Sequence, residues 1–143
     1  MSRSGYSYDC DGWSLICWRG AVASAIRGQR GQRLLRDLLA ALDAMPEKRL
    51  IAGDLEWSGD YCALGALGIA RQIDLRTLDI YDRDQVGEKF GIASALAAEI
   101  MHENDEGGLR PETPEQRWVR MRAWVAENLR DGTGGNASLE EVL

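Results

Sequence analysis

The chain has 143 residues, 45% of them hydrophobic and 28% charged, and its formal net charge is −6. A chain of this length and composition buries a hydrophobic core in one globular domain without disulfide or metal staples. The acidic balance argues against nonspecific nucleic-acid binding, which depends on clustered positive charge.

Charge is unevenly distributed along the chain. The segment Met1 to Arg36 contains six arginines and two aspartates, a balance of +4, whereas the remainder contains 11 basic and 21 acidic residues, a balance of −10. Only the N-terminal third could therefore contact a nucleic acid.

Cysteine usage and hydropathy predict a soluble protein of the cytoplasm. Cys10, Cys17 and Cys62 have no C-x-x-C spacing, so we expect reduced thiols and neither a disulfide framework nor a zinc site. The N-terminus lacks the apolar stretch of a signal peptide, and no run of about 18 apolar residues is present to span a membrane.

The first third of the chain predicts two consecutive helices. Apolar residues at three- and four-residue steps form one helix face over residues 13–27, and we expect Gly28 to end this helix in the left-handed conformation. A second amphipathic helix follows over residues 32–45, and Pro46 ends it. We expect the two helices to form a hairpin, with residues 26–36 as its turn.

Shorter elements follow in the middle of the chain. The Ser58-Gly59-Asp60 cluster predicts the turn of a small β-hairpin near residues 49–63. Helices are predicted at residues 64–72, 84–90 and 92–104, with an irregular acidic segment at 74–82. No glycine-rich nucleotide-binding motif is present, and Gly65 and Gly68 indicate close backbone packing instead.

The last helix has the clearest start. Thr113 caps it, Pro114 occupies its first turn, and Gln116 completes a T-x-x-Q capping box. Its apolar stripe consists of Trp118, Met121, Trp124, Val125 and Leu129. We expect this helix to pack on the N-terminal hairpin and to bury the following side chains: Trp18, Leu38, Leu42 and Trp124.

The predicted fold is mainly α, a single-domain helical bundle over residues 1–130 with an N-terminal helical hairpin. Residues 131–143 are predicted to be a glycine-rich linker and a short C-terminal tail. Leu139, Val142 and Leu143 form a small apolar face in this tail, which needs a groove in the same chain or in a neighbour. The interpretation we favour is docking that helps to form a homodimer or a contact between neighbouring molecules of a lattice.

Residues 84–104 have the spacing of a helix-turn-helix unit. The packing positions of such a unit are filled by Val86, Gly87, Phe90, Gly91, Ile92, Ala97 and Ile100. The outward face of the second helix would carry Ser94, Ala95, Ala98, Glu99 and His102, without arginine or lysine to meet bases or phosphates. A plain packed helix pair is therefore favoured over a DNA-reading unit.

No catalytic or metal site stands out. Glu99 and His102 form an E-x-x-H pair, but a di-metal bundle needs a second such pair and His102 is the only histidine. The same scarcity argues against a Ser-His or Cys-His nucleophile. Carboxylate acid–base chemistry stays open, although no pair such as Asp54 and Glu56 is distinguished from ordinary surface charge. We expect no cofactor, no metal and no enzyme activity.

The candidate interaction residues are Arg27, Arg30, Arg33 and Arg36, within the stretch "IRGQRGQRLLR". Arg27 lies at a predicted helix C-terminus, where the helix dipole favours a cation, but Arg30 and Arg33 lie in a first turn, where the dipole disfavours one. A local conflict of this kind points to function. Three interpretations stay open, in decreasing order of preference: a solvated basic turn, contact with an acidic protein surface, and contact with nucleic acid.

The stretches "RGAVASAIRG", "LLAALDAMP", "CALG", "ENDEGG" and "RMRAWV" resemble a family of uncharacterised small proteins of proteobacterial phages and prophages. The similarity covers most of the chain up to the end of the last predicted helix, and it transfers no catalytic residues. The resemblance implies that this protein acts in the cytoplasm of a bacterial host. It also implies that the protein binds a host protein, such as a defence nuclease, or controls phage genes.

Two functions follow from these observations. The favoured one is a non-enzymatic, phage-derived accessory protein that binds a host or phage macromolecule, with inhibition of a host defence system as one form of it. A protein partner is preferred to nucleic acid, and no membrane is involved. The alternative is a nucleic-acid-associated transcriptional regulator that uses the helix-turn-helix-like unit at residues 84–104.

Overall fold

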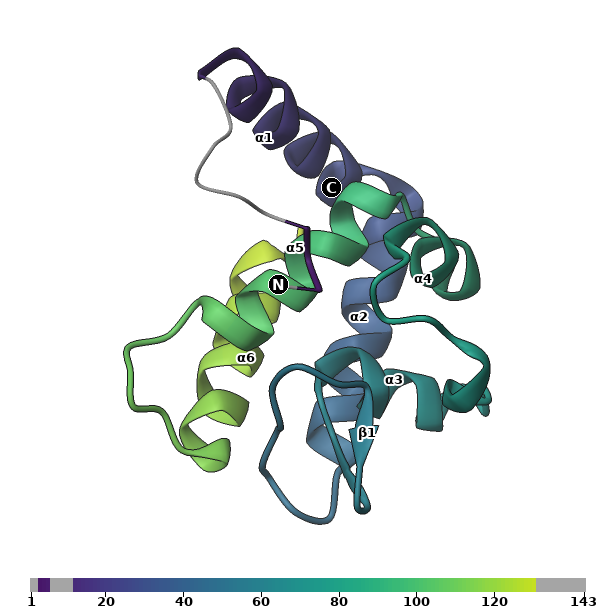
Figure 1. Cartoon of the computed structure of the whole chain (residues 1–143), viewed down its shortest axis with the longest axis vertical. Coiled ribbons are helices and arrows are strands. Elements are labelled where there is room, and N and C mark those ends of the chain that lie inside the picture. Colours follow the sequence, from purple (N-terminus) through teal and green to yellow (C-terminus); the bar gives the residue numbers. More distant parts are fainter. Residues whose placement is uncertain (1–2, 6–11, 131–143) are drawn as a thin grey trace, which may run out of the picture.

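The computed structural model describes residues 3–5 and 12–130, with the side chains of residues 12–15 left out. The elements in chain order are α1 (Gly12–Arg27), α2 (Gln29–Ala44), β1 (Glu56–Trp57), β2 (Asp60–Tyr61), α3 (Ala63–Ala70), the 3-10 helix η1 (Leu75–Thr77), α4 (Arg83–Phe90), α5 (Ser94–Glu106) and α6 (Pro114–Asn128) (Figure 1). The predicted mainly-α fold with a small β-hairpin is confirmed. The predicted linker, tail and tail-mediated homodimer concern residues 131–143, which lie outside the described residues.

The connection between α1 and α2 is tighter than predicted. Gly28 has φ −72° and ψ 162°, an extended conformation, so the prediction of a left-handed cap is wrong. The Gly28 N–H donates to the Ser24 carbonyl (3.1 Å) and the Gly28 carbonyl accepts from the Gln32 N–H (2.9 Å), so one residue both closes α1 and opens α2. α1 leaves α2 at an angle and points away from the body, whereas a hairpin would lie along α2 (Figure 1).

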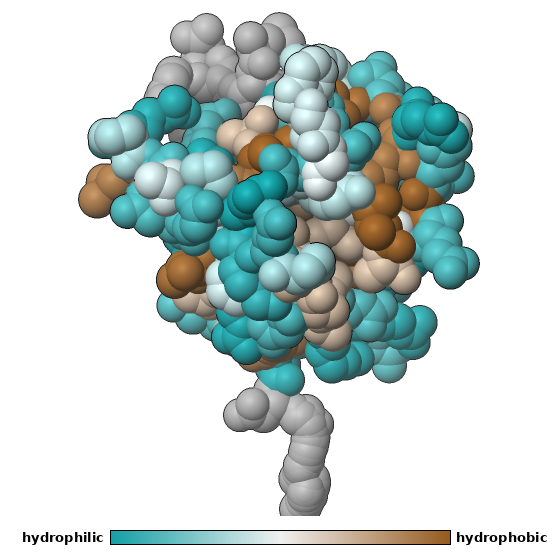
Figure 2. All heavy atoms as spheres, turned by 90° about the horizontal axis from the view of Figure 1, so that it is seen from below, coloured by the Kyte–Doolittle hydropathy of each residue, from teal (hydrophilic) through white to brown (hydrophobic). Residues whose placement is uncertain are grey.

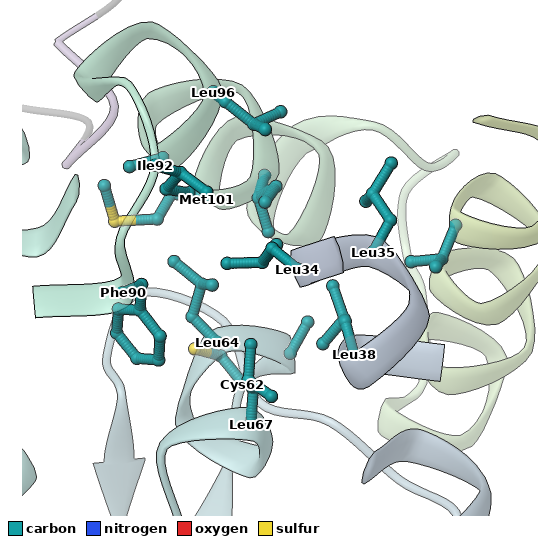
Figure 3. Close-up of a cluster of buried hydrophobic side chains, with 14 of the residues drawn as sticks. Leu34, Leu35, Leu38, Cys62, Leu64, Leu67, Phe90, Ile92, Leu96 and Met101 are labelled. Atoms are coloured by element: carbon teal, nitrogen blue, oxygen red, sulfur yellow. The ribbon is translucent and has the colours of Figure 1, made fainter. Parts of the chain in front are cut away.

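The hydrophobic core forms where α2, α3, α4 and α5 meet. Figure 3 shows Leu34 of α2, Leu64 and Leu67 of α3, Phe90 of α4 and Met101 of α5 pointing toward one another. α5 is the central helix, since it packs against α1, α3, α4 and α6. Burial on several sides explains why α5 contains apolar residues around most of its circumference.

α6 runs antiparallel to α2. Trp118 Nε1 donates to the Leu42 carbonyl (3.2 Å) near one end of the pair, and Gln32 Nε2 donates to the Asn128 carbonyl (3.0 Å) at the other. The last helix was predicted to pack on the N-terminal hairpin, and the structure shows that it packs on α2, the second helix of that pair.

The predicted core residues differ in how deeply they are buried. Leu38 and Leu42 are fully buried, as predicted. Trp18 and Trp124 are half-buried and pack against the margin of the core.

The predicted turn of the β-hairpin and the predicted capping box of the last helix are both present. Ser58 and Gly59 both have positive φ, 51° and 84°, and form the two-residue turn between β1 and β2. Thr113 and Gln116 form the predicted capping box, with the Gln116 N–H donating to Thr113 Oγ1 (3.1 Å) and the Thr113 N–H donating to Gln116 Oε1 (2.9 Å). These pairings depend on neighbours in sequence, so the sequence shows them directly.

Two glycines of α3 allow the close packing predicted for them. A Cβ at Gly65 would lie 1.9 Å from the Leu55 carbonyl oxygen, and a Cβ at Gly68 would lie 2.5 Å from Leu75 Cδ2. α3 therefore rests directly on the backbone that precedes the hairpin. Within the described residues, no helix is both long and apolar enough to cross a lipid bilayer.

Candidate interaction surface

Four exposed arginines gather where α1 meets α2. Arg27 is the last residue of α1, and Arg30, Arg33 and Arg36 follow at three-residue steps in the first turns of α2. Residues three apart are neighbours on a helix, so the three side chains of α2 occupy one side over about 9 Å of its axis. Arg30 and Arg33 are exposed as predicted. We call these four residues the arginine surface.

Gly31 allows the first turn of α2 to contact the end of α1. A Cβ at this position would lie 2.0 Å from the Ala25 carbonyl oxygen and 3.3 Å from Ile26 Cα. These obstacles are backbone atoms, which no rotamer change can move away. Glycine is therefore the residue that permits this crossing, and the crossing sets the angle between the two helices that carry the arginines.

Gln32 lies on the buried side of α2, beneath the arginine surface. Its side chain is buried, and its Nε2 donates to the Ile26 carbonyl (2.7 Å) and to the Asn128 carbonyl (3.0 Å). Its Oε1 accepts from the Arg130 N–H (2.8 Å). One amide thus connects the end of α1, the start of α2 and the end of α6.

None of the four arginines pairs with a carboxylate of the described residues. The two acidic residues of α2 are already engaged: Asp37 Oδ2 accepts from Arg71 Nη2 (2.8 Å), and Asp43 accepts from Arg122 Nε (2.6 Å) and Nη2 (3.0 Å). The Arg122 hydrogen bonds hold the pKa of Asp43 below its ordinary value. The N-terminal half of α2 is therefore positive, and its C-terminal half is compensated.

Most arginines elsewhere in the structure are compensated. Of the eleven outside the arginine surface, seven form ion pairs with carboxylates: Arg3, Arg49, Arg71, Arg76, Arg117, Arg120 and Arg122. Four arginines, Arg19, Arg83, Arg110 and Arg130, have no ion pair among the described residues. The arginine surface differs from these in that its four unpaired arginines follow one another at three-residue steps.

The position of these charges on α2 is unfavourable for the isolated fold. Gly28 provides no side-chain cap, and the first turn of α2 contains no acidic residue. Cations in the first turn of a helix oppose the helix dipole, at a cost of about 0.3–1 kcal/mol each. Nothing in the described residues offsets this cost, so the arrangement points to a role outside the fold.

A second polar site, buried, lies between the N-terminal residues and the end of α5. Arg3 is 3% exposed and donates to Asp105 through Nε (2.8 Å) and Nη2 (2.9 Å). Burial raises the pKa of Asp105, but the hydrogen bonds and charge of Arg3 outweigh it and keep that pKa low. Asn104 continues the network, donating to the Ile51 carbonyl (2.9 Å) and accepting from the Ala63 N–H (3.1 Å).

A cavity of about 700 Å³ opens beside this network. Its ionic side chains are largely paired with one another, Arg3 with Asp105 and Arg117 with Glu112 (3.3 Å). Cys62, the nearest thiol, is buried, and its Sγ accepts from the Gly65 N–H (3.3 Å) as the N-cap of α3. Arg3, Asp105 and Cys62 thus act in the fold.

The helix-turn-helix-like unit has the predicted geometry but not an open recognition helix. α4 and α5 flank Gly91, which has φ 74° and is left-handed. Ala95 and Ala98, two residues of the predicted outward face, are buried. The half-buried positions that remain, Ser94, Glu99 and His102, include no arginine or lysine to meet a phosphate backbone.

The E-x-x-H pair on α5 does not form a metal site. His102 Nδ1 lies 3.6 Å from Glu106 Oε1, one helical turn along. Among the residues that the structure describes, no three His, Cys, Asp or Glu side chains converge to hold a metal ion. Asp54 and Glu56 likewise form no pair, since Glu56 Oε2 accepts from the Gly59 N–H (3.3 Å) in the hairpin turn.

An apolar groove of about 390 Å³ lies between the end of α2, the hairpin and α3. Figure 2 views the molecule from this side and shows apolar side chains gathered among hydrophilic ones. The charged groups at the rim pair with each other, Arg49 with Glu47 (2.7 Å) and with Asp60 (2.8 Å). The groove therefore offers apolar contact without a free charge to select a partner.

Comparison with known proteins finds no matching family model, no matching curated protein and no matching solved structure. The assignment of the site therefore depends on the chemistry of this chain. Sequence reasoning singled out the arginines but missed Gln32, Arg3 and Asp105. A glutamine within an otherwise apolar helix face was the available signal for Gln32, whereas Arg3 and Asp105 are 102 positions apart and gave none.

Proposed function

We propose that this protein is a non-catalytic binding protein whose arginine surface contacts an acidic surface of a protein partner. The observation that carries the proposal is the set of four exposed arginines without a carboxylate partner among the described residues, in a fold where seven other arginines are paired. An arginine left unpaired on a rigid platform keeps its guanidinium free for bidentate bonds to carboxylates of another molecule.

The platform is preorganised, which supports binding over a purely solvated turn. Gly31 and Gln32 fix the crossing of α1, α2 and α6 through backbone contact and three hydrogen bonds. Binding to a rigid surface avoids the entropic cost of ordering a loop. Only the arginine side chains themselves have to be ordered when a partner binds.

A protein partner is favoured over nucleic acid for two reasons. Nucleic-acid affinity comes mainly from neutralised phosphates, and the rest of this chain, with its excess of acidic residues, repels a polyanion that extends beyond the four arginines. The helix that would read DNA, α5, is packed against four other helices. A compact acidic patch on a protein avoids both problems.

The resemblance to phage and prophage proteins supports a biological setting for this activity. In that setting the protein acts in the cytoplasm of a bacterial host and binds a host or phage protein stoichiometrically. Inhibition of a host defence enzyme is one form of such an activity, because masking a surface requires no catalysis.

The test is a parallel capture from a bacterial lysate with three full-length baits: wild type, Arg30→Glu/Arg33→Glu, and the control Arg76→Glu/Arg110→Glu. The control makes the same change of charge at two other exposed arginines. We expect a protein that is retained by wild type and by the control and lost with the arginine-surface variant. Identical captures with all three baits would contradict the proposal.

A nucleic-acid arm accompanies this capture. Duplex DNA is titrated with wild type at several salt concentrations. Binding through all four arginines would give a slope of log K against log salt of about −3.6, from about −0.9 for each neutralised phosphate. Tight binding with this slope, lost in Arg30→Glu/Arg33→Glu, would replace the protein partner with a nucleic acid.

A further inference from the structure

The cavity beside the Arg3–Asp105 pair has the size and the walls of a ligand site. Its volume is about 700 Å³, within the range of about 300–1,000 Å³ that small-molecule sites occupy. Arg3 and Asp105 form one wall, where the Gly53 N–H also donates to Asp105 Oδ1 (3.0 Å). The connection between α5 and α6 forms another, held by Arg120, which donates to Glu112 through Nε (2.7 Å) and Nη2 (3.0 Å). Hydrogen bonds of the fold thus preform the cavity.

Two carboxylates that line the cavity are already saturated. Asp105 accepts two hydrogen bonds from Arg3 and a further one from Asn104 Nδ2 (2.8 Å). Glu112 accepts both of its short hydrogen bonds from Arg120. These two carboxylates are therefore occupied by other groups, and they leave further arginines of the cavity without a full set of acceptors.

Arg117 and Arg110 are the arginines with unused donors in the cavity lining. Arg117 Nη1 donates to the Leu50 carbonyl (3.1 Å), but the buried Nε makes no hydrogen bond although it lies 3.3 Å from Glu112 Oε1, and Nη2 makes none with the described residues. Arg110 is exposed and forms no ion pair with another described residue. Guanidinium groups with free N–H donors favour an anion, because a carboxylate or phosphate accepts two such bonds at once.

The charge of the cavity agrees with one anionic group. The arginines that line it or pair with its carboxylates are Arg3, Arg110, Arg117 and Arg120. The carboxylates that line it are Asp105, Glu106 and Glu112. Glu106 opposes an anion, but its Oε1 lies 3.6 Å from His102 Nδ1. Four positive against three negative side chains leave a balance of +1.

Exposed apolar side chains indicate what else the ligand contains. Six large hydrophobic side chains are exposed among the described residues, and two of them, Tyr81 (62%) and Leu109 (91%), line this cavity. The ring of a tyrosine stacks in an offset arrangement on another planar ring, and this contact removes apolar surface from water. A ligand with a planar ring beside its anionic group would use both kinds of side chain.

We propose that this cavity binds a small organic anion with a planar ring, an aryl phosphate or an aromatic carboxylate. Its anionic group bonds Arg117 and Arg110, and its ring covers Tyr81. The proposal does not rest on the proposed function. The cavity borders the N-terminal end of α6, whereas Gln32 and the arginine surface lie at the C-terminal end of this 15-residue helix, about 22 Å away. Substitution of Arg110 therefore leaves the arginine surface intact.

The test is a titration of the ¹⁵N-labelled full-length protein, followed by NMR at constant ionic strength, with phenyl phosphate and benzoate as probes. We expect saturable shifts of the amide signals of residues 52–53, 81 and 105–117 with at least one probe, and the probe that binds identifies the anionic group as phosphate or carboxylate. Inorganic phosphate, which lacks the ring, should bind at least about threefold more weakly than phenyl phosphate. Phenol, which lacks the anion, should bind at least about tenfold more weakly than the probe that binds.

Matched variants locate the site. Arg110→Gln and Tyr81→Leu change exposed side chains, so both proteins should fold, and each should weaken probe binding about threefold. The controls Arg19→Gln and Trp57→Leu remove an exposed arginine and an exposed aromatic ring elsewhere and should bind like wild type. Arg117→Gln should weaken binding at least about tenfold. Thermal denaturation shows whether this last variant is folded, and the two exposed variants decide the question if it is not.

Three results would overturn the proposal. Amide signals that show no saturable shift with either probe at millimolar concentration would exclude the ligand class. Equal affinities of wild type, Arg110→Gln and Tyr81→Leu would place the probe elsewhere. Inorganic phosphate that binds as tightly as phenyl phosphate would indicate an adventitious ion only. None of these results changes the capture with Arg30→Glu/Arg33→Glu, so the proposed function and the cavity ligand fail or stand separately.

Discussion

Replacement of Gln32 by alanine should destabilise the domain far more than a surface substitution does. The Gln32 side chain makes three hydrogen bonds, at 2.7, 2.8 and 3.0 Å, that connect α1, α2 and α6. The bond to the Ile26 carbonyl is buried, so its loss leaves an unsatisfied acceptor at a cost of about 1–3 kcal/mol. The other two groups are partly open to water, and each contributes about 0.5–1 kcal/mol.

The expected loss is therefore about 2–5 kcal/mol, reduced by a few tenths because alanine has the higher helix propensity. Urea unfolding measures it. At a slope of about 2 kcal/mol per molar urea, the midpoint should fall by about 1–2.5 M with an unchanged slope. Gln29→Ala, on the exposed side of the same helix, is the matched control and should change the stability by less than about 0.5 kcal/mol. A loss for Gln32→Ala as small as that of the control would refute the role given to Gln32.

Four further predictions concern stability. Arg30→Glu/Arg33→Glu should not lower the free energy of unfolding in urea titration, because both side chains are exposed and the change replaces cations that oppose the helix dipole; an unfolded variant would show that the turn is structural. Leu38→Ala should cost about 2–5 kcal/mol in the same assay, since Leu38 is fully buried, and a smaller loss would mean that its site collapses around the alanine. Gly31→Ala should destabilise by at least about 1–3 kcal/mol by thermal denaturation, because the new Cβ meets the Ala25 carbonyl oxygen at 2.0 Å; propensity alone favours alanine by about 1 kcal/mol, so a stabilised variant would contradict the crossing. Arg3 lowers the pKa of Asp105 despite burial, so the stabilisation it provides is present above the ordinary aspartate pKa and is lost as the pH falls through the lowered value. The stability difference between wild type and Asp105→Asn should accordingly shrink between about pH 5 and pH 2, and a difference independent of pH would disprove the coupling.

The parts of the fold that depend on local chemistry were readable from the sequence. The capping box of Thr113 and Gln116 and the turn at Ser58 and Gly59 involve partners two or three residues apart. The exposure of Arg30 and Arg33 followed from the amphipathic pattern of α2, whose leucines had to face the core.

The direction of α1 was not readable, because it depends on contacts between distant segments. Gly28 was expected to adopt the left-handed conformation that commonly follows a helix, but α2 begins at the next residue and leaves no room for such a cap. The angle is then fixed by the backbone contact of Gly31 and by the packing of α1 on α5. Gly31 lies within residues 26–36, but the sequence does not show which backbone it contacts or that α1 packs on α5.

The candidate site was only half predictable for the same reason. A sequence shows that arginines are present but not whether carboxylates elsewhere compensate them. Asp37 is four residues from Arg33 and was available as a partner on the helix surface, yet it pairs with Arg71 of the loop after α3. The structure shows that Asp37 and Asp43, the carboxylates of α2, pair with arginines from other segments, which leaves Arg30, Arg33 and Arg36 unpaired.

The central claim is that the arginine surface binds an acidic protein, and the most direct measurement is the dissociation constant of the captured partner, purified, for the full-length protein. Wild type, Arg30→Glu/Arg33→Glu and Arg76→Glu/Arg110→Glu are titrated under identical salt. We predict that the arginine-surface variant weakens binding at least tenfold, which corresponds to 1.4 kcal/mol, while the control variant binds like wild type. Equal dissociation constants for wild type and Arg30→Glu/Arg33→Glu would contradict the account.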